Sequence, residues 1–182
     1  MSKFLVLLPL LLAFGFGQNL LTNGDFEQPL TTGWTTSSSG AVTIDRQTGL
    51  RPVPGYQARD SLYGYGAGKL SQIVDVPGTH AVLTFWASFN IGQPGSCWPV
   101  SCVAASYYDA SGTWLGETRF YLHTASCTWT PTSTMNLIDV TTTNWTQYTL
   151  DIASEVSQHL PGVNPDLVSK VGVALFDTTS GG

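Results

Sequence analysis

Charged residues are scarce in this chain of 182 residues, which has only 7 Lys and Arg against 12 Asp and Glu. The net charge of -5 argues against a nucleic-acid backbone as partner, because phosphate binding relies on clustered Lys and Arg. Helical periodicity is nearly absent as well, and only IASEVSQHL (152–160) allows one or two turns. Abundant Ser, Thr, Gly and aromatic residues instead indicate an extracellular β-protein whose ligands are neutral and polar.

Long apolar runs are missing, apart from a short one at the N-terminus. Residues 1–17, MSKFLVLLPLLLAFGFG, combine an early Lys, an apolar segment and small residues before the expected cleavage point. The segment is too short to span a hydrocarbon core of about 30 Å, so a secretory signal peptide is favoured over a retained anchor. We therefore expect a secreted or cell-surface protein with a single domain over 18–182, and no membrane span after signal cleavage.

Cysteine is limited to Cys97, Cys102 and Cys127, whose spacing does not resemble that of a zinc site, which usually needs four ligands. In an exported chain a disulfide is expected, and the odd number leaves one thiol over. A Cys97–Cys127 bridge would join two Trp-bearing loops at one end of a hairpin. The alternative is Cys97–Cys102, and the spacing does not decide between them.

Catalytic motifs are also lacking. The chain has no G-x-S-x-G, no H-E-x-x-H and no phosphate-binding glycine loop, and its three His are far apart in sequence. No pair of carboxylates is marked out for glycoside hydrolysis. We therefore expect a protein without enzymatic activity of its own.

What the chain does contain is a series of short β-branched and aromatic runs, separated by Gly, Pro, Asn and Asp. This pattern predicts an all-β fold, an antiparallel β-sandwich or jelly roll. The predicted strands are 19–27, 41–46, 61–65, 69–76, 80–90, 101–109, 113–123, 145–152 and 168–177.

Two of these runs show which side chains point inward. In AVLTFWASFN (81–90), Leu83 and Phe85 alternate with Trp86, so the first two face a core and the third faces water. In LGETRFYLH (115–123), Phe120 alternates with Arg119 in the same way. We predict that Trp86 and Arg119 share one wet face of a sheet.

Aromatic rings stack on the C–H faces of sugars, while Arg, Glu, His and Asn bind hydroxyl groups. The shared face therefore predicts carbohydrate binding, with Trp86→Ala abolishing retention on polysaccharide. The predicted ligand-binding residues are Trp86, Asn90, Tyr108, Glu117, Arg119, Tyr121 and His123, with Trp98 or Trp129 at the rim.

Several stretches together carry a family resemblance. NLLTNGDFEQPLTTGW (19–34), DSLYGYGAGKLSQIVDVPGTHAVLTFWASF (60–89), AASYYDASGTWLGE (104–117) and TNWTQYTLDI (143–152) occur in the order found in carbohydrate-binding modules of the family four and nine type. The chain thus resembles these secreted modules, which are galactose-binding-like jelly rolls. The resemblance implies that Trp34 packs in the core.

The same resemblance implies a structural calcium, with Glu27 and the neighbouring Asp25 as carboxylate ligands. The family's final strand, which supplies a further Asp, is missing after VGVALFDTTSGG (171–182). We therefore expect a C-terminally truncated domain whose gene product continues into a further domain.

The predicted function is a secreted, non-catalytic module that binds polysaccharide or oligosaccharide through an aromatic and polar sheet face. A structural or adhesive module of a cell-surface protein is one alternative, since Ser and Thr richness suits it equally. An accessory domain of a larger glycoside hydrolase is the other.

Overall fold

The computed structural model describes residues 19–49, 55–77, 80–92, 98–125 and 129–180. Strands dominate these ranges, and no helix within them is long and apolar enough to cross a membrane. The strands are β1 (Thr35–Thr48), β2 (Tyr56–Asp75), β3 (Val82–Ala87), β4 (Trp98–Tyr108), β5 (Trp114–His123), β6 (Met135–Asp139), β7 (Thr146–Asp151) and β8 (Lys170–Ser180). A helix, α1 (Ile152–His159), and a 3-10 turn, Pro165–Leu167, lie between β7 and β8.

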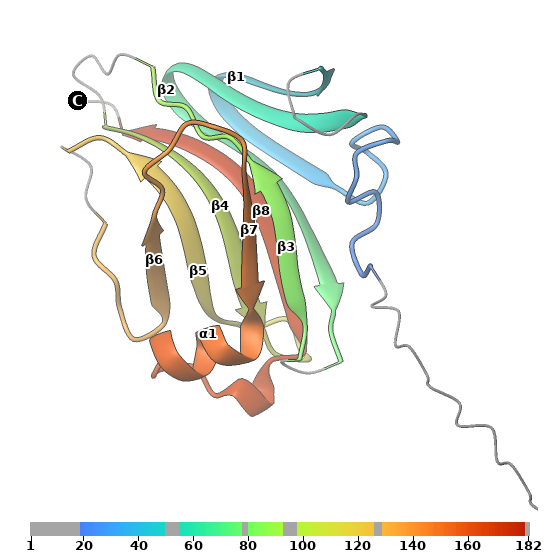
Figure 1. Cartoon of the computed structure of the whole chain (residues 1–182), viewed down its shortest axis with the longest axis vertical. Coiled ribbons are helices and arrows are strands. Elements are labelled where there is room, and N and C mark those ends of the chain that lie inside the picture. Colours follow the sequence, from blue (N-terminus) through green and yellow to red (C-terminus); the bar gives the residue numbers. More distant parts are fainter. Residues whose placement is uncertain (1–18, 50–54, 78–79, 93–97, 126–128, 181–182) are drawn as a thin grey trace, which may run out of the picture.

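The strands form two layers (Figure 1). One is a six-stranded sheet in the order β1-β2-β8-β4-β5-β6, and the other is the β3-β7 pair. All pairs are antiparallel except β5 with β6, which is parallel. The predicted β-sandwich is confirmed, with the parallel β6 as an addition that the sequence did not indicate.

The core lies between the two layers and follows the predicted alternation. Leu83 is buried on β3, and Phe85 contacts Phe120 of β5 edge-on, with ring centroids 5.2 Å apart. Tyr148 of β7 stacks on Phe85 at 5.3 Å. These contacts confirm the inward faces predicted for β3 and β5, because alternate residues of a strand point to opposite sides.

The predicted strand at 19–27 is wrong. Asn23 and Phe26 have positive φ angles of 52° and 60°, which residues other than glycine do not adopt in a regular strand, and this segment is a series of turns. Phe26 nevertheless packs on Trp34, with centroids 5.1 Å apart, and Trp34 is buried as expected. The Trp34 indole donates a hydrogen bond of 3.1 Å to the Asn23 carbonyl, which ties the segment to the sandwich.

The predicted strands 61–65 and 69–76 are parts of one long strand, β2, which pairs with β1 along most of its length. Two glycines allow this pair to bend where its register shifts. Gly40 and Gly66 have φ angles of 78° and 145°, and a Cβ on either would collide with the carbonyl of the opposite strand. The hairpin therefore extends past the point where β8 joins the sheet.

Helix α1 closes one end of the sandwich (Figure 1). Asp151 caps its N-terminus by accepting the Ser154 N–H at 2.8 Å. The buried Glu155 points inward and accepts hydrogen bonds from Thr118 Oγ1 at 2.6 Å and Asn136 Nδ2 at 2.7 Å. Glu155 thus joins the helix to β5 and β6.

Replacing Glu155 with Ala should lower the free energy of unfolding by about 1 to 2 kcal/mol, because two donors then lose their acceptor in a buried position. Urea unfolding followed by fluorescence measures the change. Gln158→Ala, at an exposed position of the same helix, is the control. Equal stability of both variants would show that the Glu155 contacts contribute nothing.

Candidate functional site

The outer face of the six-stranded sheet, which points away from β3 and β7, carries a row of directly paired residues. Ser37 on β1 lies opposite Lys69 on β2, and Lys69 lies opposite Phe176 on β8. Phe176 pairs in turn with Cys102 on β4, and Cys102 with Tyr121 on β5. Strand register therefore places a hydroxyl, an ammonium and aromatic rings across five neighbouring strands.

The adjacent row holds three small side chains followed by an arginine. Ser71, Ala174, Ala104 and Arg119 follow one another across β2, β8, β4 and β5. Because two alanines stand in the middle of the sheet and longer side chains surround them, the face is hollowed there. The hollow thus forms because strand register brings two small side chains together between longer ones.

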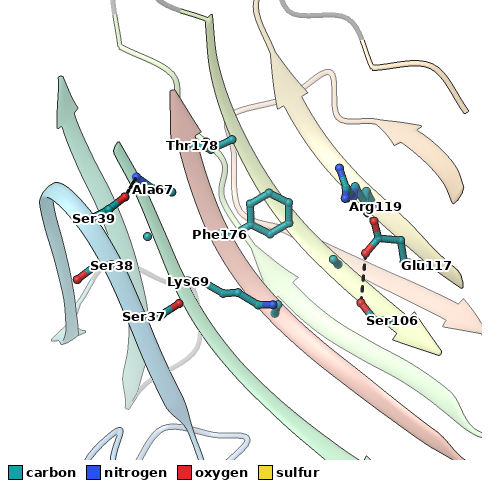
Figure 2. Close-up of a pocket in the computed structure, with 13 residues that line it drawn as sticks. Ser37, Ser38, Ser39, Ala67, Lys69, Ser106, Glu117, Arg119, Phe176 and Thr178 are labelled. Carbon is teal, nitrogen blue, oxygen red and sulfur yellow. Dashed lines mark hydrogen bonds and ion pairs between the residues drawn. The ribbon is translucent and has the colours of Figure 1, made fainter. Parts of the chain in front are cut away.

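The resulting hollow has a volume of about 530 Å³ (Figure 2). Hydroxyl groups, two cations, one carboxylate and a phenyl ring surround its small-residue floor. Its lining residues are Ser37, Ser38, Ser39, Ala67, Gly68, Lys69, Ala104, Ser106, Glu117, Arg119, Ala174, Phe176 and Thr178. We call this feature the outer hollow.

Arg119 and Glu117 form an ion pair at one side of the outer hollow. Glu117 also accepts a hydrogen bond of 3.3 Å from Ser106 on β4, as Figure 2 shows. The side chains are only 22% and 14% exposed, so the pair is held in place rather than solvated. Arg119 Nε is buried without a hydrogen-bond partner among the described residues.

The guanidinium of Arg119 packs against aromatic rings. Its guanidinium carbon lies 4.4 Å from the centre of the Trp129 ring and 5.6 Å from that of Phe176. Trp129 stacks on Tyr121 at 5.3 Å, and Tyr121 stacks on His123 at 4.6 Å. The stack fixes the guanidinium plane at the edge of the outer hollow, an arrangement that suits recognition of planar or forked acceptors.

A buried thiol lies beneath these rings. Cys102 is 2% exposed and packs with Tyr121, Trp129 and Phe176. Burial raises the pKa of the Cys102 thiol well above its ordinary value, so the group stays neutral. Cys102 is a free cysteine in the structure. Cys97 and Cys127 lie outside the described residues, and their pairing stays a prediction.

Two carboxylates lie close together on the inner side of the same sheet. Asp177 pairs with Gly68, and a Cβ on Gly68 would collide with the Asp60 carboxylate, so glycine makes room for that group. Burial first, and then the charge of Asp177, raise the pKa of Asp60 to about 7. Burial likewise raises the pKa of Asp177 to about 6, although Ser101 hydrogen-bonds to it. Neither Asp60 oxygen has a well-formed hydrogen bond.

The predicted shared face of Trp86 and Arg119 is wrong. Phe85 and Phe120 meet in the core, and each is adjacent in sequence to one of the two residues. Because neighbours in a strand point to opposite sides, Trp86 and Arg119 lie on opposite outer surfaces of the sandwich. Trp86 is 43% exposed on β3 and does not line the outer hollow.

The remaining predicted site residues fall into two groups. Glu117, Arg119, Tyr121, His123 and Trp129 are brought together on or beside β5. By contrast, Tyr108 and Asn90 do not line the outer hollow. Tyr108 ends β4 opposite Lys170 and packs beside Gly172, while Asn90 is exposed after β3. The side chain of Trp98 lies outside the described part of the structure.

The residues predicted to bind calcium lie in the N-terminal turns. Asp25 Oδ1 accepts the Glu27 N–H at 3.3 Å, and Glu27 Oε1 accepts the Tyr56 N–H at 2.9 Å. Calcium takes six to eight oxygen ligands. Within the described ranges no three acidic, His or Cys side chains come together around a metal. Carbonyl oxygens also bind calcium, so a calcium site at Asp25 and Glu27 stays a prediction.

Sequence reasoning missed the part of the outer hollow that lies on β1, β2 and β8. Lys69 and Phe176 belong to strands whose faces were not assigned, and the serines at 37–39 precede the first strand predicted near them. Alternation in VALFDT would have placed Phe176 opposite Leu175 and Asp177. Nothing in the sequence indicated that β8 lies between β2 and β4.

Solved structures with a similar fold share little sequence with this chain. The enzymatically active domain of tailspike protein 4 from bacteriophage CBA120 aligns at a TM-score of 0.53 and 16% identity, covering 90% of this chain and 20% of the tailspike chain. A carbohydrate-binding module of the β-sandwich superfamily, studied for its promiscuous specificity, aligns at 0.48 and 16%, covering 90% and 59%. The family 11 carbohydrate-binding module of Lic26A-Cel5E from Clostridium thermocellum aligns at 0.38 and 11%, covering 90% and 92%.

No protein-family model matches this chain, and no curated protein sequence matches it. The likeness to the tailspike domain therefore shows the fold alone, and this chain spans about a fifth of that tailspike chain. The narrower assignment to the family four and nine type stays a prediction.

Proposed function

We propose that this protein binds carbohydrate without changing it covalently, through the outer hollow. The observation that carries the proposal is the position of the Arg119–Glu117 pair beside Phe176 in an open concavity lined with hydroxyl groups. Sugar recognition needs an apolar ring for the C–H faces and fixed donors and acceptors for the hydroxyl groups. The outer hollow supplies each of these from neighbouring strands.

The chemistry available in the outer hollow favours binding over catalysis. Its single acidic group, Glu117, is already engaged by Arg119 and Ser106. Glycoside hydrolysis needs a second carboxylate across the scissile bond, and no other acidic residue of the described ranges lines the outer hollow. We infer a module that retains its ligand without cleaving it.

Affinity should be modest, since an open hollow with one partly buried phenyl ring buries little of a sugar. Dissociation constants in the micromolar to millimolar range follow, corresponding to roughly 4 to 8 kcal/mol of binding free energy. We also propose that the protein is secreted, on the sequence of the N-terminal segment alone.

Affinity electrophoresis against a panel of soluble β-glucans, xylans, mannans and pectins tests the proposal. We expect the purified domain to be retarded by at least one polymer, and the retardation to be abolished by excess free oligosaccharide. Unretarded migration in every gel, with the protein shown to be folded by circular dichroism, would refute carbohydrate binding. That result would favour the structural or adhesive alternative.

A further inference from the structure

Lys69 differs from the other cationic side chains of the described residues in having no partner. Arg59 and Lys170 form ion pairs with Asp45 and Asp75, at 2.7 and 2.5 Å. Arg119 is paired with Glu117, as described above. Arg46 lies 4.0 Å over the Tyr56 ring and donates a hydrogen bond to the Phe26 carbonyl. Lys69 alone of these has neither an ion pair nor a hydrogen bond with a described residue.

The unpartnered ammonium lies in the outer hollow. Figure 2 shows the Lys69 side chain reaching from β2 across β8, beside the Phe176 ring. The floor between Lys69 and Arg119 is made of the small residues Ala174 and Ala104. Neither alanine side chain can form an ion pair or a hydrogen bond with the Lys69 ammonium. On the far side of this floor stands Arg119, whose Nε lacks a partner.

Every strand that faces Lys69 lacks a free acidic group on this side of the sheet. The lining residues are serines on β1, Ala174, Phe176 and Thr178 on β8, and Ala104 and Ser106 on β4. On β5, Glu117 is neutralised by Arg119. The outer hollow as a whole therefore carries one uncompensated positive charge, in a protein whose net charge is -5.

We propose that the outer hollow selects glycans that carry a carboxylate, with Lys69 as the residue that binds the charged group. The inference rests on the proposed carbohydrate-binding function and narrows it to uronic-acid-containing sugars. A uronate seated above Ala174 would place its carboxylate against Lys69, with Arg119 and Ser37 left to bind hydroxyl groups. The neutral ligands expected from the composition would then bind less tightly.

The net negative charge of the whole protein limits which anionic polymers it can bind. A net charge of -5 repels polyanions in general, so attraction to a uronate polymer has to come from the site itself. Binding should weaken as salt rises, because an exposed ion pair is screened by counterions. Asp60 and Asp177 do not compete for Lys69, since they lie on the inner side of the sheet.

The test compares uronate polymers with their own carboxyl-reduced forms. Polygalacturonate, alginate and glucuronoxylan are each used before and after reduction of the carboxylate to an alcohol, alongside dextran sulfate and neutral β-glucan. We expect at least one native polymer to bind about tenfold more tightly than its reduced form, and Lys69→Gln to remove that preference. Lys170→Gln, which alters a lysine outside the outer hollow, should keep it.

Each other outcome overturns the inference in a distinguishable way. Equal binding of native and reduced polymers, or a preference that survives Lys69→Gln, shows that Lys69 does not select carboxylates while carbohydrate binding stands. Binding of dextran sulfate without any uronate identifies a sulfate ester as the ligand group. Binding to no polymer at all overturns both this inference and the proposed function.

Discussion

Replacing Arg119 with Met is expected to lower glycan affinity at least tenfold. Met keeps the apolar contact with Trp129 and Phe176 but removes the guanidinium, and hydrogen bonds from charged groups contribute about 1.5 to 3 kcal/mol each. The dissociation constant, measured by isothermal titration calorimetry with the tightest-binding polymer of the panel, reports the change. Trp86→Ala should leave it unaltered, because that indole lies on the opposite surface.

Loss of the Arg119 charge also leaves Glu117 without its ion-pair partner, so stability has to be measured alongside affinity. A thermal unfolding midpoint within a few degrees of wild type shows that Arg119→Met is folded. Phe176→Leu provides a second route, since it keeps an apolar side chain and removes the flat ring that would stack on a sugar. Wild-type affinity in both variants, or a loss of binding in Trp86→Ala, would move the site away from the outer hollow.

The second large effect is on stability and concerns the buried pair Asp60 and Asp177. Each carboxyl has a folded-state pKa above its ordinary value of 3.8, at about 7 and about 6. The folded protein therefore binds these protons more tightly than the unfolded chain does. Their favourable contribution is complete below pH 4 and is lost as pH rises to about 7, so the free energy of unfolding should fall across that window.

The double variant Asp60→Asn, Asp177→Asn isolates this contribution. At pH 8 it should be more stable than wild type by about 2 to 3 kcal/mol, an amount reduced from the full shift because both side chains keep some solvent contact. At pH 4 the difference should nearly vanish, since the wild-type carboxyls are then protonated. Urea unfolding at half-unit intervals from pH 4 to 8 measures the profile.

Other carboxyls give a useful contrast in the same experiment. Hydrogen bonds from Arg59, Ser111 and Ser154 respectively hold the pKa values of Asp45, Asp109 and Asp151 below the ordinary range. Their contributions are present above pH 4 and are lost below it, so they do not overlap the window of the buried pair. A double variant that is less stable than wild type at pH 8 would contradict the prediction, because it would show that the two ionised carboxylates do not destabilise the folded protein.

The layered fold and its inward faces could be predicted from the sequence because both follow from local pattern. Alternation in the strands that carry Phe85 and Phe120 identifies which side chains are buried, whatever the neighbouring strands are. Absence of helical periodicity excluded other fold classes in the same way. The segment 19–27 escaped prediction because its positive φ angles at Asn23 and Phe26 reflect packing against Trp34, and a strand-like composition does not reveal this.

The candidate site was only half predictable for a related reason. The β5 residues, with Arg119 and Glu117 at their centre, came from alternation within one strand, and they do lie together. Trp86 also lies on a polar strand face, but alternation does not say which of two sheets a strand belongs to. That question depends on strand order, which is set by contacts between residues far apart in sequence.

By itself, then, the sequence determined that this chain is built from strands, which of their residues are buried, and that β5 presents a polar and aromatic face. Only the tertiary structure decided that Lys69 and Phe176 lie next to the β5 residues on the same face. It also placed Trp86 on the opposite surface of the sandwich. The physical reason is that alternate residues of a strand point to opposite faces, so the pattern within one strand already shows which of its side chains are buried. A concave site, by contrast, arises from the register of five strands whose pairing partners are distant along the chain.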